Sequence, residues 1–289
     1  NSTLNISSAA GGVTTITNSG GALSLTKMGT AAATIPSGQT LTYTGSTNVT
    51  GGTLNIASAL NGTSALSSTG VGSSLNLTGL MSAPASVNSV TVGAGAFMSF
   101  QNGVGTPLSN LTTLNLGEGP SGTATLSLDL GTTTDTLTTS VAPTIANTVT
   151  LNLGAGTGLL DNTAYNLLVA PGGLGSLGNY ILGNQPGGYS NGSLSMISDT
   201  NVIYTSGSAI VGDFYWNNTQ ATSSWSTNNN GSTNFTTDLA GTIDRTGVPG
   251  PNNSVIFAST NATTLSGTSF TTALDANFSV AGLQFTANP

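Results

Sequence analysis

The chain is 289 residues long, is 4% charged and carries a net charge of −7, with Lys27 and Arg245 as its only cations. An ordinary soluble domain is about a quarter charged. Because nucleic acids and anionic membrane surfaces are bound through clusters of lysine and arginine, this composition argues against both as partners. The chain contains no cysteine, which excludes disulfides and thiolate chemistry.

A short strand motif recurs through the first half of the chain: a small residue, an apolar residue, a small polar residue and a second apolar residue. It occupies residues 3–6, 22–25, 40–43, 53–56, 74–77, 89–92, 113–116, 125–128 and 150–153. Alternation with a period of two places the apolar side chains on one face of a strand and the polar side chains on the other. Each motif therefore predicts one half-buried strand.

Glycine pairs such as Gly20-Gly21 and Gly51-Gly52 separate the motifs and supply the positive φ that tight corners need. No helical period of useful length is present. We predict an all-β fold, a β-solenoid similar to a parallel β-helix, in which successive strands stack at about 4.8 Å. The apolar motif residues are expected to form one buried column, among them Leu4, Ile6, Leu23, Leu25, Leu54, Ile56, Leu75, Leu77, Leu114 and Leu116.

The domain organisation follows from changes in composition. Residues 165–169 open a denser segment with two further expected strands, 193–197 and 201–204, which we interpret as the closing layers of the solenoid. Residues 206–212 are a connector of small residues, and both tryptophans follow it. The sequence therefore predicts a solenoid over residues 1–205 and a smaller β-rich segment over residues 213–289 that leads into the next copy.

The carboxy-terminal segment contains an ordered series of aromatic and glycine motifs: Phe214-Tyr215-Trp216, Ser224-Trp225-Ser226, Asn234-Phe235, 238–241 (DLAG), 248–250 (VPG), 254–257 (SVIF) and 278–285 (FSVAGLQF). This series resembles the autotransporter-associated β-strand repeat proteins, long surface proteins of verrucomicrobial and planctomycete-like bacteria. The resemblance implies an extracellular β-solenoid passenger without enzymatic activity. The family usually has Asn-Trp where this chain has Asn234-Phe235, so an aromatic packing role is expected there without an indole N–H.

The order of the parts also differs from that family, in which the tryptophan-rich segment precedes the strand motifs. We therefore expect the 289 residues to be one period of a longer array, or a subunit whose carboxy-terminal strand completes the first layer of the next subunit. The chain begins without a signal peptide, and we interpret it as a mature or excised portion of a secreted, cell-surface protein. No apolar run approaches the roughly 18 residues of a membrane span.

The residues available for catalysis predict no enzyme. Without histidine and cysteine, and with a single lysine, the usual pairs of nucleophile and base are absent. Parallel β-helices include polysaccharide-cleaving enzymes that use paired carboxylates, but the nine acids are scattered singly. We expect Lys27 to be a solvated side chain and Asp129 and Asp135 to be turn or rim carboxylates.

Calcium is an alternative that the sequence leaves open, although we predict no cofactor. Three loop groups offer hard oxygen ligands: Asp161-Asn162, Asp238 with residues 228–230, and Asp244 with Asn252-Asn253. None matches a calcium-binding loop motif, and Asx-turns explain the same residues without metal. We therefore expect the assembled protein to stay intact with chelators and between roughly pH 5 and 9, where almost nothing titrates.

The sequence favours a structural function: an extracellular solenoid unit that joins head to tail with copies of itself into a fibre or surface array. The joint is expected at the two chain ends, through Leu4, Ile6, Phe278, Val280, Leu283 and Phe285. The alternative is an adhesin that binds surface glycans, with the solenoid as a stalk. In that case Tyr215, Trp216 and Trp225 would stack on sugars, although we favour core positions for the tryptophans.

Overall fold

The structure is a computed structural model that describes residues 2–6, 15–17, 20–81, 84–217, 224–225, 232–258, 272–274 and 278–286. The chain divides into two compact units. The first comprises Asn1–Leu159, Tyr165–Gly183 and Leu194–Tyr204, and the second comprises Leu160–Ala164, Asn184–Ser193 and Thr205–Pro289. Two internal segments, 160–164 and 184–193, thus belong with the second unit, as does the expected connector 206–212.

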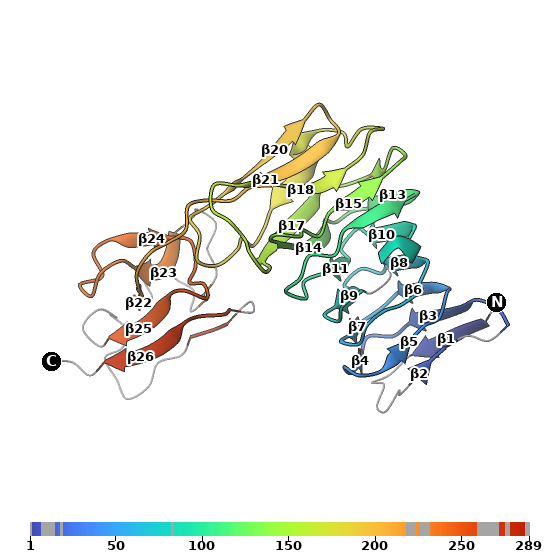
Figure 1. The fold of residues 1–289 in the computed structure, drawn as a ribbon, viewed down its shortest axis with the longest axis horizontal. Helices are drawn as coiled ribbons and strands as arrows, with labels where there is room; N and C mark the ends of the chain where they lie inside the picture. Colours follow the sequence, from blue (N-terminus) through green and yellow to red (C-terminus); the bar gives the residue numbers. More distant parts are fainter. Residues whose placement is uncertain are drawn as a thin grey trace. The chain divides into compact units, whose positions relative to one another are not determined.

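The first unit is a β-solenoid of about nine turns, as the strand motif predicts. Its parallel strands stack on three faces, and the chain visits the faces in the same order in each turn. One turn illustrates this order: β10 (Ser89–Gly93) lies on the first face, β11 (Phe97–Ser99) on the second and β12 (Leu108–Leu111) on the third. Figure 1 shows β3, β6, β8, β10 and β13 side by side along the first face.

The strands of the first and second faces form one hydrogen-bonded sheet each, and those of the third face form two separate sheets. The first face contains β1 (Ser2–Ile6), β3 (Leu23–Lys27), β6 (Ser46–Val49), β8 (Ala65–Ser68), β10, β13 (Thr113–Glu118) and β16 (Thr144–Ile145). The second contains β4 (Ala32–Ile35), β7 (Thr53–Ile56), β9 (Ser74–Leu77), β11, β14 (Ala124–Leu130), β17 (Val149–Ala155) and β19 (Tyr180–Leu182). The third contains the pair β2 (Thr15–Ile16) and β5 (Thr40–Leu41), then β12, β15 (Leu137–Thr139), β18 (Ala164–Val169), β21 (Asn201–Thr205) and β20 (Ser193–Ile197).

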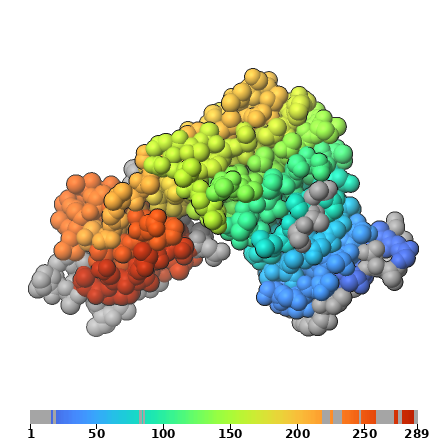
Figure 2. Space-filling view, viewed as in Figure 1, coloured from blue at the N-terminus to red at the C-terminus, as the bar shows by residue number. Residues whose placement is uncertain are grey.

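The length of a turn is read from the register between strands of one face. It is 19 residues from Ser46 to its partner Ala65, and 31 residues from Val149 to Tyr180. The turns therefore lengthen toward the carboxy-terminal end, and successive turns form the stacked colour bands of the first unit in Figure 2. The recurring motif has an irregular spacing because its copies lie on different faces: four on the first, four on the second and one, residues 40–43, on the third.

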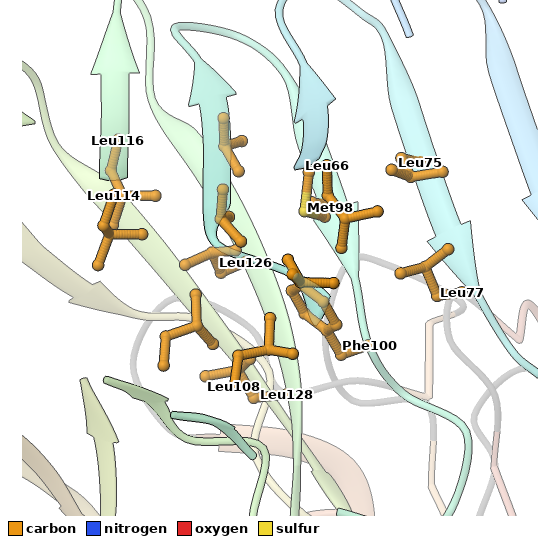
Figure 3. Close-up of a cluster of buried hydrophobic side chains, with 14 of the residues drawn as sticks. Leu66, Leu75, Leu77, Met98, Phe100, Leu108, Leu114, Leu116, Leu126 and Leu128 are labelled. Atoms are coloured by element: carbon orange, nitrogen blue, oxygen red, sulfur yellow. The ribbon is translucent and has the colours of Figure 1, made fainter. Parts of the chain in front are cut away.

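The apolar residues of the three faces meet in one core cluster. Leu25 and Leu114 from the first face and Leu54 and Leu75 from the second are at most 1% exposed. Figure 3 shows part of this cluster, in which leucines from both faces surround Met98 and Phe100. The expected buried column is thus one core to which different sheets contribute. Leu23 is partly buried against this core. The side chains of Leu4 and Ile6 lie outside what the structure describes.

The corner glycines have the conformation that the sequence predicts. Gly52, between β6 and β7, has a φ of +63°. A Cβ at this position would lie 2.5 Å from the carbonyl oxygen of Gly29 in the preceding turn. Both the dihedral angle and the close approach therefore require glycine.

The carboxy-terminal end of the solenoid is closed by a hairpin. Strands β20 and β21 are neighbours in the third sheet, and Ser198 and Asp199 between them have φ of 49° and 58°. Two consecutive positive φ values are typical of a type I′ hairpin turn. Leu194 and Met196 of β20 pack partly buried against the core, so these strands are the closing layers that the sequence predicts.

The second unit contains a five-stranded sheet in the order β24 (Asp244–Thr246), β23 (Ser232–Thr236), β22 (Phe214–Trp216), β25 (Ser254–Ala258) and β26 (Gly282–Thr286). Its β22, β25 and β26 are parallel, and β23 is antiparallel to both β22 and β24. Helical structure among the described residues is limited to two 3-10 turns, η1 (Pro84–Ser86) and η2 (Leu177–Asn179), both in the first unit.

Candidate functional site

Strand β26 is an edge strand with an uncovered apolar side. Its register pairs Leu283 with Val255 and Phe285 with Phe257, and both partners are buried in the core of the second unit. Leu283 and Phe285 therefore lie on the core-facing side of the sheet. They are nevertheless 54% and 69% exposed, so the described residues leave this part of the core face open.

The rings of Phe285 and Phe257 stack with centroids 5.0 Å apart and an angle of 10° between their planes. In-register stacking of like side chains is what consecutive turns of a solenoid produce. The offset between the paired residues Ser254 and Gly282 is 28 residues, within the range of turn lengths found in the first unit. Strand β26 thus has the geometry of a solenoid layer.

Strand β1 is the corresponding edge of the first unit. Its described partner is β3, and the register pairs Leu4 with Leu25, Asn5 with Thr26 and Ile6 with Lys27. Leu25 and Lys27 are fully buried, so positions 4 and 6 of β1 are in register with inward positions of the solenoid. The described part of the chain places no strand on the other edge of β1.

The aromatic residues of the second unit form its core. Trp216, Trp225, Phe235 and Phe257 are at most 5% exposed, and Phe235 makes edge-to-face contacts with both tryptophans at centroid distances of 5.2 and 5.5 Å. Phe235 therefore has the packing role that the sequence predicts. Phe278 and Val280, expected at the joint, pack partly buried against this same core.

The packing of the two tryptophans argues against a role for them in sugar stacking. The rings of Trp216 and Trp225 are covered by other aromatic rings, which leaves no open ring face for a sugar at either residue. The indole N–H of Trp225 donates to Thr272 Oγ1 at 2.6 Å. Tyr215 is half-buried between the two core residues Phe214 and Trp216 of β22.

The loop groups considered for calcium are held by hydrogen bonds within the chain. Asp238 accepts from the backbone N–H and the hydroxyl of Thr242, and the hydroxyl of Ser208 donates to Asn162 Oδ1 at 3.2 Å. Asn253 is 1% exposed; its Oδ1 accepts from Gly250 N–H. In the described residues no three acidic, histidine or cysteine side chains form a group that could hold a metal ion. Residues 228–230 lie outside the described part, as does any contribution from them.

Lys27 is not solvated, contrary to the sequence-based expectation. It is fully buried at an inward position of β3, in register with Val49 of β6. Its Nζ donates to the carbonyl oxygens of Met28 at 2.7 Å, of Gly29 at 2.8 Å and of Gly51 at 3.1 Å. The ammonium group therefore uses all three of its donors and joins the corners of two successive turns.

Asp129 and Asp135 are buried, contrary to the expectation of turn or rim carboxylates: Asp129 lies within β14, and Asp135 lies in the connection between β14 and β15. Asp129 Oδ2 accepts from the backbone N–H groups of Asn102 and Gly103 at 2.7 and 2.6 Å. The Asp135 carboxylate accepts from Asp129 N–H and from Thr106 N–H. Burial raises the pKa of Asp135 to about 7, while these N–H donors act in the opposite direction. Both carboxylates thus fix the preceding turn and are closed to solvent.

No family model, curated protein or solved structure matches the chain. The described residues include no helix of the length and apolarity that crossing a membrane requires.

Proposed function

We propose that the protein is an extracellular structural unit that joins end to end with copies of itself. The observation that carries this proposal is the exposed, core-facing pair Leu283 and Phe285 on the edge strand β26. Burying each side chain is worth about 1.5–3 kcal/mol, and an unpaired parallel edge also offers backbone N–H and C=O groups to another strand.

The unpaired edges of β1 and β26 face opposite directions along a parallel stack. In a parallel stack, each strand pairs through one edge with the preceding turn and through the other edge with the following turn. The described partner of β1 comes later in the chain, and the described partner of β26 comes earlier. The edge of β26 that the described residues leave unpaired therefore accepts a following layer, and the corresponding edge of β1 accepts a preceding one. Such a heterologous contact does not close, so it extends a fibre.

The composition supports assembly through strand edges, and the family resemblance supports an extracellular location. With 4% charged residues, the chain has little charge repulsion to keep strand edges apart. The resemblance of residues 213–289 to autotransporter-associated β-strand repeat proteins also favours a surface protein. Antibody labelling of intact cells of the source organism tests the location, and labelling only after permeabilisation would contradict it.

Electron microscopy of the purified protein tests the assembly. We expect regular filaments from the intact chain and none from a chain truncated after Ala281, which lacks β26 but keeps Phe278 and Val280 in the aromatic core. Circular dichroism of the truncated chain controls for folding. A matched control replaces Val71 and Leu80, which are exposed on the solenoid, by Asp and should leave the filaments intact. A monomeric intact chain that is retained on a carbohydrate column would favour the adhesin instead.

A further inference from the structure

The register of the joint follows from the alternation of the two edge strands. Inward positions are 283 and 285 in β26 and 4 and 6 in β1, as their partners in the neighbouring strands show. A shift of one residue would bring inward positions opposite outward ones and place apolar side chains on the solvent side. Only shifts by an even number of residues keep the two faces matched.

Among these shifts, one matches two apolar pairs. With Leu283 opposite Leu4, Phe285 lies opposite Ile6 and the strands share four paired positions. With Phe285 opposite Leu4, Leu283 lies opposite Ser2 and Ile6 has no partner in β26. The first register therefore buries more apolar surface for the same number of backbone pairs.

The same register brings two amides together. It places Gln284 opposite Asn5, each between the two apolar residues of its strand. The solenoid already contains such a pair: Asn55 and Asn76 are register partners on neighbouring strands, and Asn76 Nδ2 donates to Asn55 Oδ1 at 2.7 Å. Each lies between apolar residues that are at most 2% exposed.

We infer that β26 of one copy adds to the free edge of β1 in a second copy as a parallel strand, with Leu283, Gln284 and Phe285 paired to Leu4, Asn5 and Ile6 and an amide hydrogen bond between Gln284 and Asn5. This inference rests on the proposed end-to-end assembly and names its contact. The partner surface is a second copy of this chain, and the amide pair fixes the register.

Cysteine cross-linking tests this register without interference, because the chain has no cysteine of its own. In the inferred register, Cα atoms 284 and 5 are about 4.8 Å apart, within the range of a disulfide. In the register shifted by two residues they are about 8 Å apart, and position 286 takes the place opposite position 5. The test pair is Gln284→Cys with Asn5→Cys, and the matched control is Thr286→Cys with Asn5→Cys.

Filaments of each variant are grown under reducing conditions, oxidised and run on a non-reducing gel. We expect a ladder of multiples of 28.3 kDa from the 284/5 pair and monomer from the 286/5 pair. A ladder from the 286/5 pair, or filaments that cross-link through neither pair, would overturn the register while leaving assembly intact. Absence of filaments from the unmodified chain would overturn the proposed function itself.

A charge exchange gives a second measurement that does not depend on oxidation. Gln284→Asp with Asn5→Asp places like charges opposite each other, whereas Gln284→Lys with Asn5→Asp places opposite charges there. We expect the first variant to raise the critical concentration for assembly at least tenfold above that of the second. Equal critical concentrations would contradict the pairing of Gln284 with Asn5.

Discussion

Lys27 illustrates how one buried residue joins two turns of the solenoid. A lysine at the end of a strand, beside Met28 and close to a glycine corner, is normally a solvated side chain, so the local sequence does not indicate burial. The burial depends on carbonyl oxygens from two corners, of which Gly51 is 24 residues away in the chain. Contacts of this kind become visible only when the register between turns is known.

Replacing Lys27 tests this role. Lys27→Ala leaves a cavity and removes the donor from three part-buried hydrogen bonds, and should lower the free energy of unfolding by about 2–4 kcal/mol. Lys27→Met keeps most of the stem and should cost less, which isolates the contribution of Nζ. Met28→Ala at the neighbouring, 39% exposed position is the control and should stay within about 0.5 kcal/mol. Urea denaturation measures all three, and a neutral Lys27→Ala would contradict the assignment.

Asp135 gives the protein a pH dependence that the composition does not suggest. Because burial raises its pKa from 3.8 to about 7, the folded chain binds this proton more tightly than the unfolded chain does. The free energy of unfolding should therefore fall as the pH rises from about 4 to 7, by at most about 1.4 kcal/mol per pH unit, and then level off. Burial raises the pKa of Asp129 as well, which acts in the same direction.

The expectation that almost nothing titrates between roughly pH 5 and 9 is thus wrong for Asp135. Urea denaturation at pH 5 and pH 8 should find the protein less stable at pH 8. Asp135→Asn cannot titrate and should flatten this profile, at a cost of about 1–3 kcal/mol because its amide group faces a backbone N–H donor. Equal stability of the unmodified protein at the two pH values would contradict the assignment.

At the scale of the strand, alternation predicts most of the solenoid. All nine copies of the strand motif overlap strands of the structure. The strand motif does not predict β6, because the polar residue Thr47 occupies an inward position there. Thr47 is buried and hydrogen-bonds with the hydroxyl groups of Tyr43 and Thr63. Sequence alone does not distinguish a buried threonine with such partners from an exposed threonine, so alternation does not predict this strand.

The strand motif makes a direct prediction about stability. Leu114→Ala removes a 1% exposed side chain from the core and should lower the free energy of unfolding by about 2–5 kcal/mol. Thr113→Ala changes a half-buried position on the other face of β13 and should cost far less. Thermal and urea denaturation measure both, and equal costs would show that Leu114 is not a core residue.

At the scale of the whole molecule, the sequence predicts two units but not which segments belong to each. Segments 160–164 and 184–193 lie within the predicted solenoid and belong to the second unit. Local pattern cannot reveal this, because their partners are distant in the chain: the hydroxyl of Ser206 donates to the carbonyl of Leu160 at 2.7 Å. Of the six residues expected at the joint, Leu283 and Phe285 are exposed on a strand edge, whereas Phe278 and Val280 contribute to the aromatic core.

The central claim, a head-to-tail joint between unlike edges, is tested most directly by mixing two variants that are each blocked at one end. One carries Leu4→Asp and Ile6→Asp, the other Leu283→Asp and Phe285→Asp, and both are examined by sedimentation velocity. Each variant alone should remain a 28.3 kDa monomer, and an equimolar mixture should form a species of twice that mass without growing further. Dimers or filaments from either variant alone, or a mixture that stays monomeric, would contradict the account.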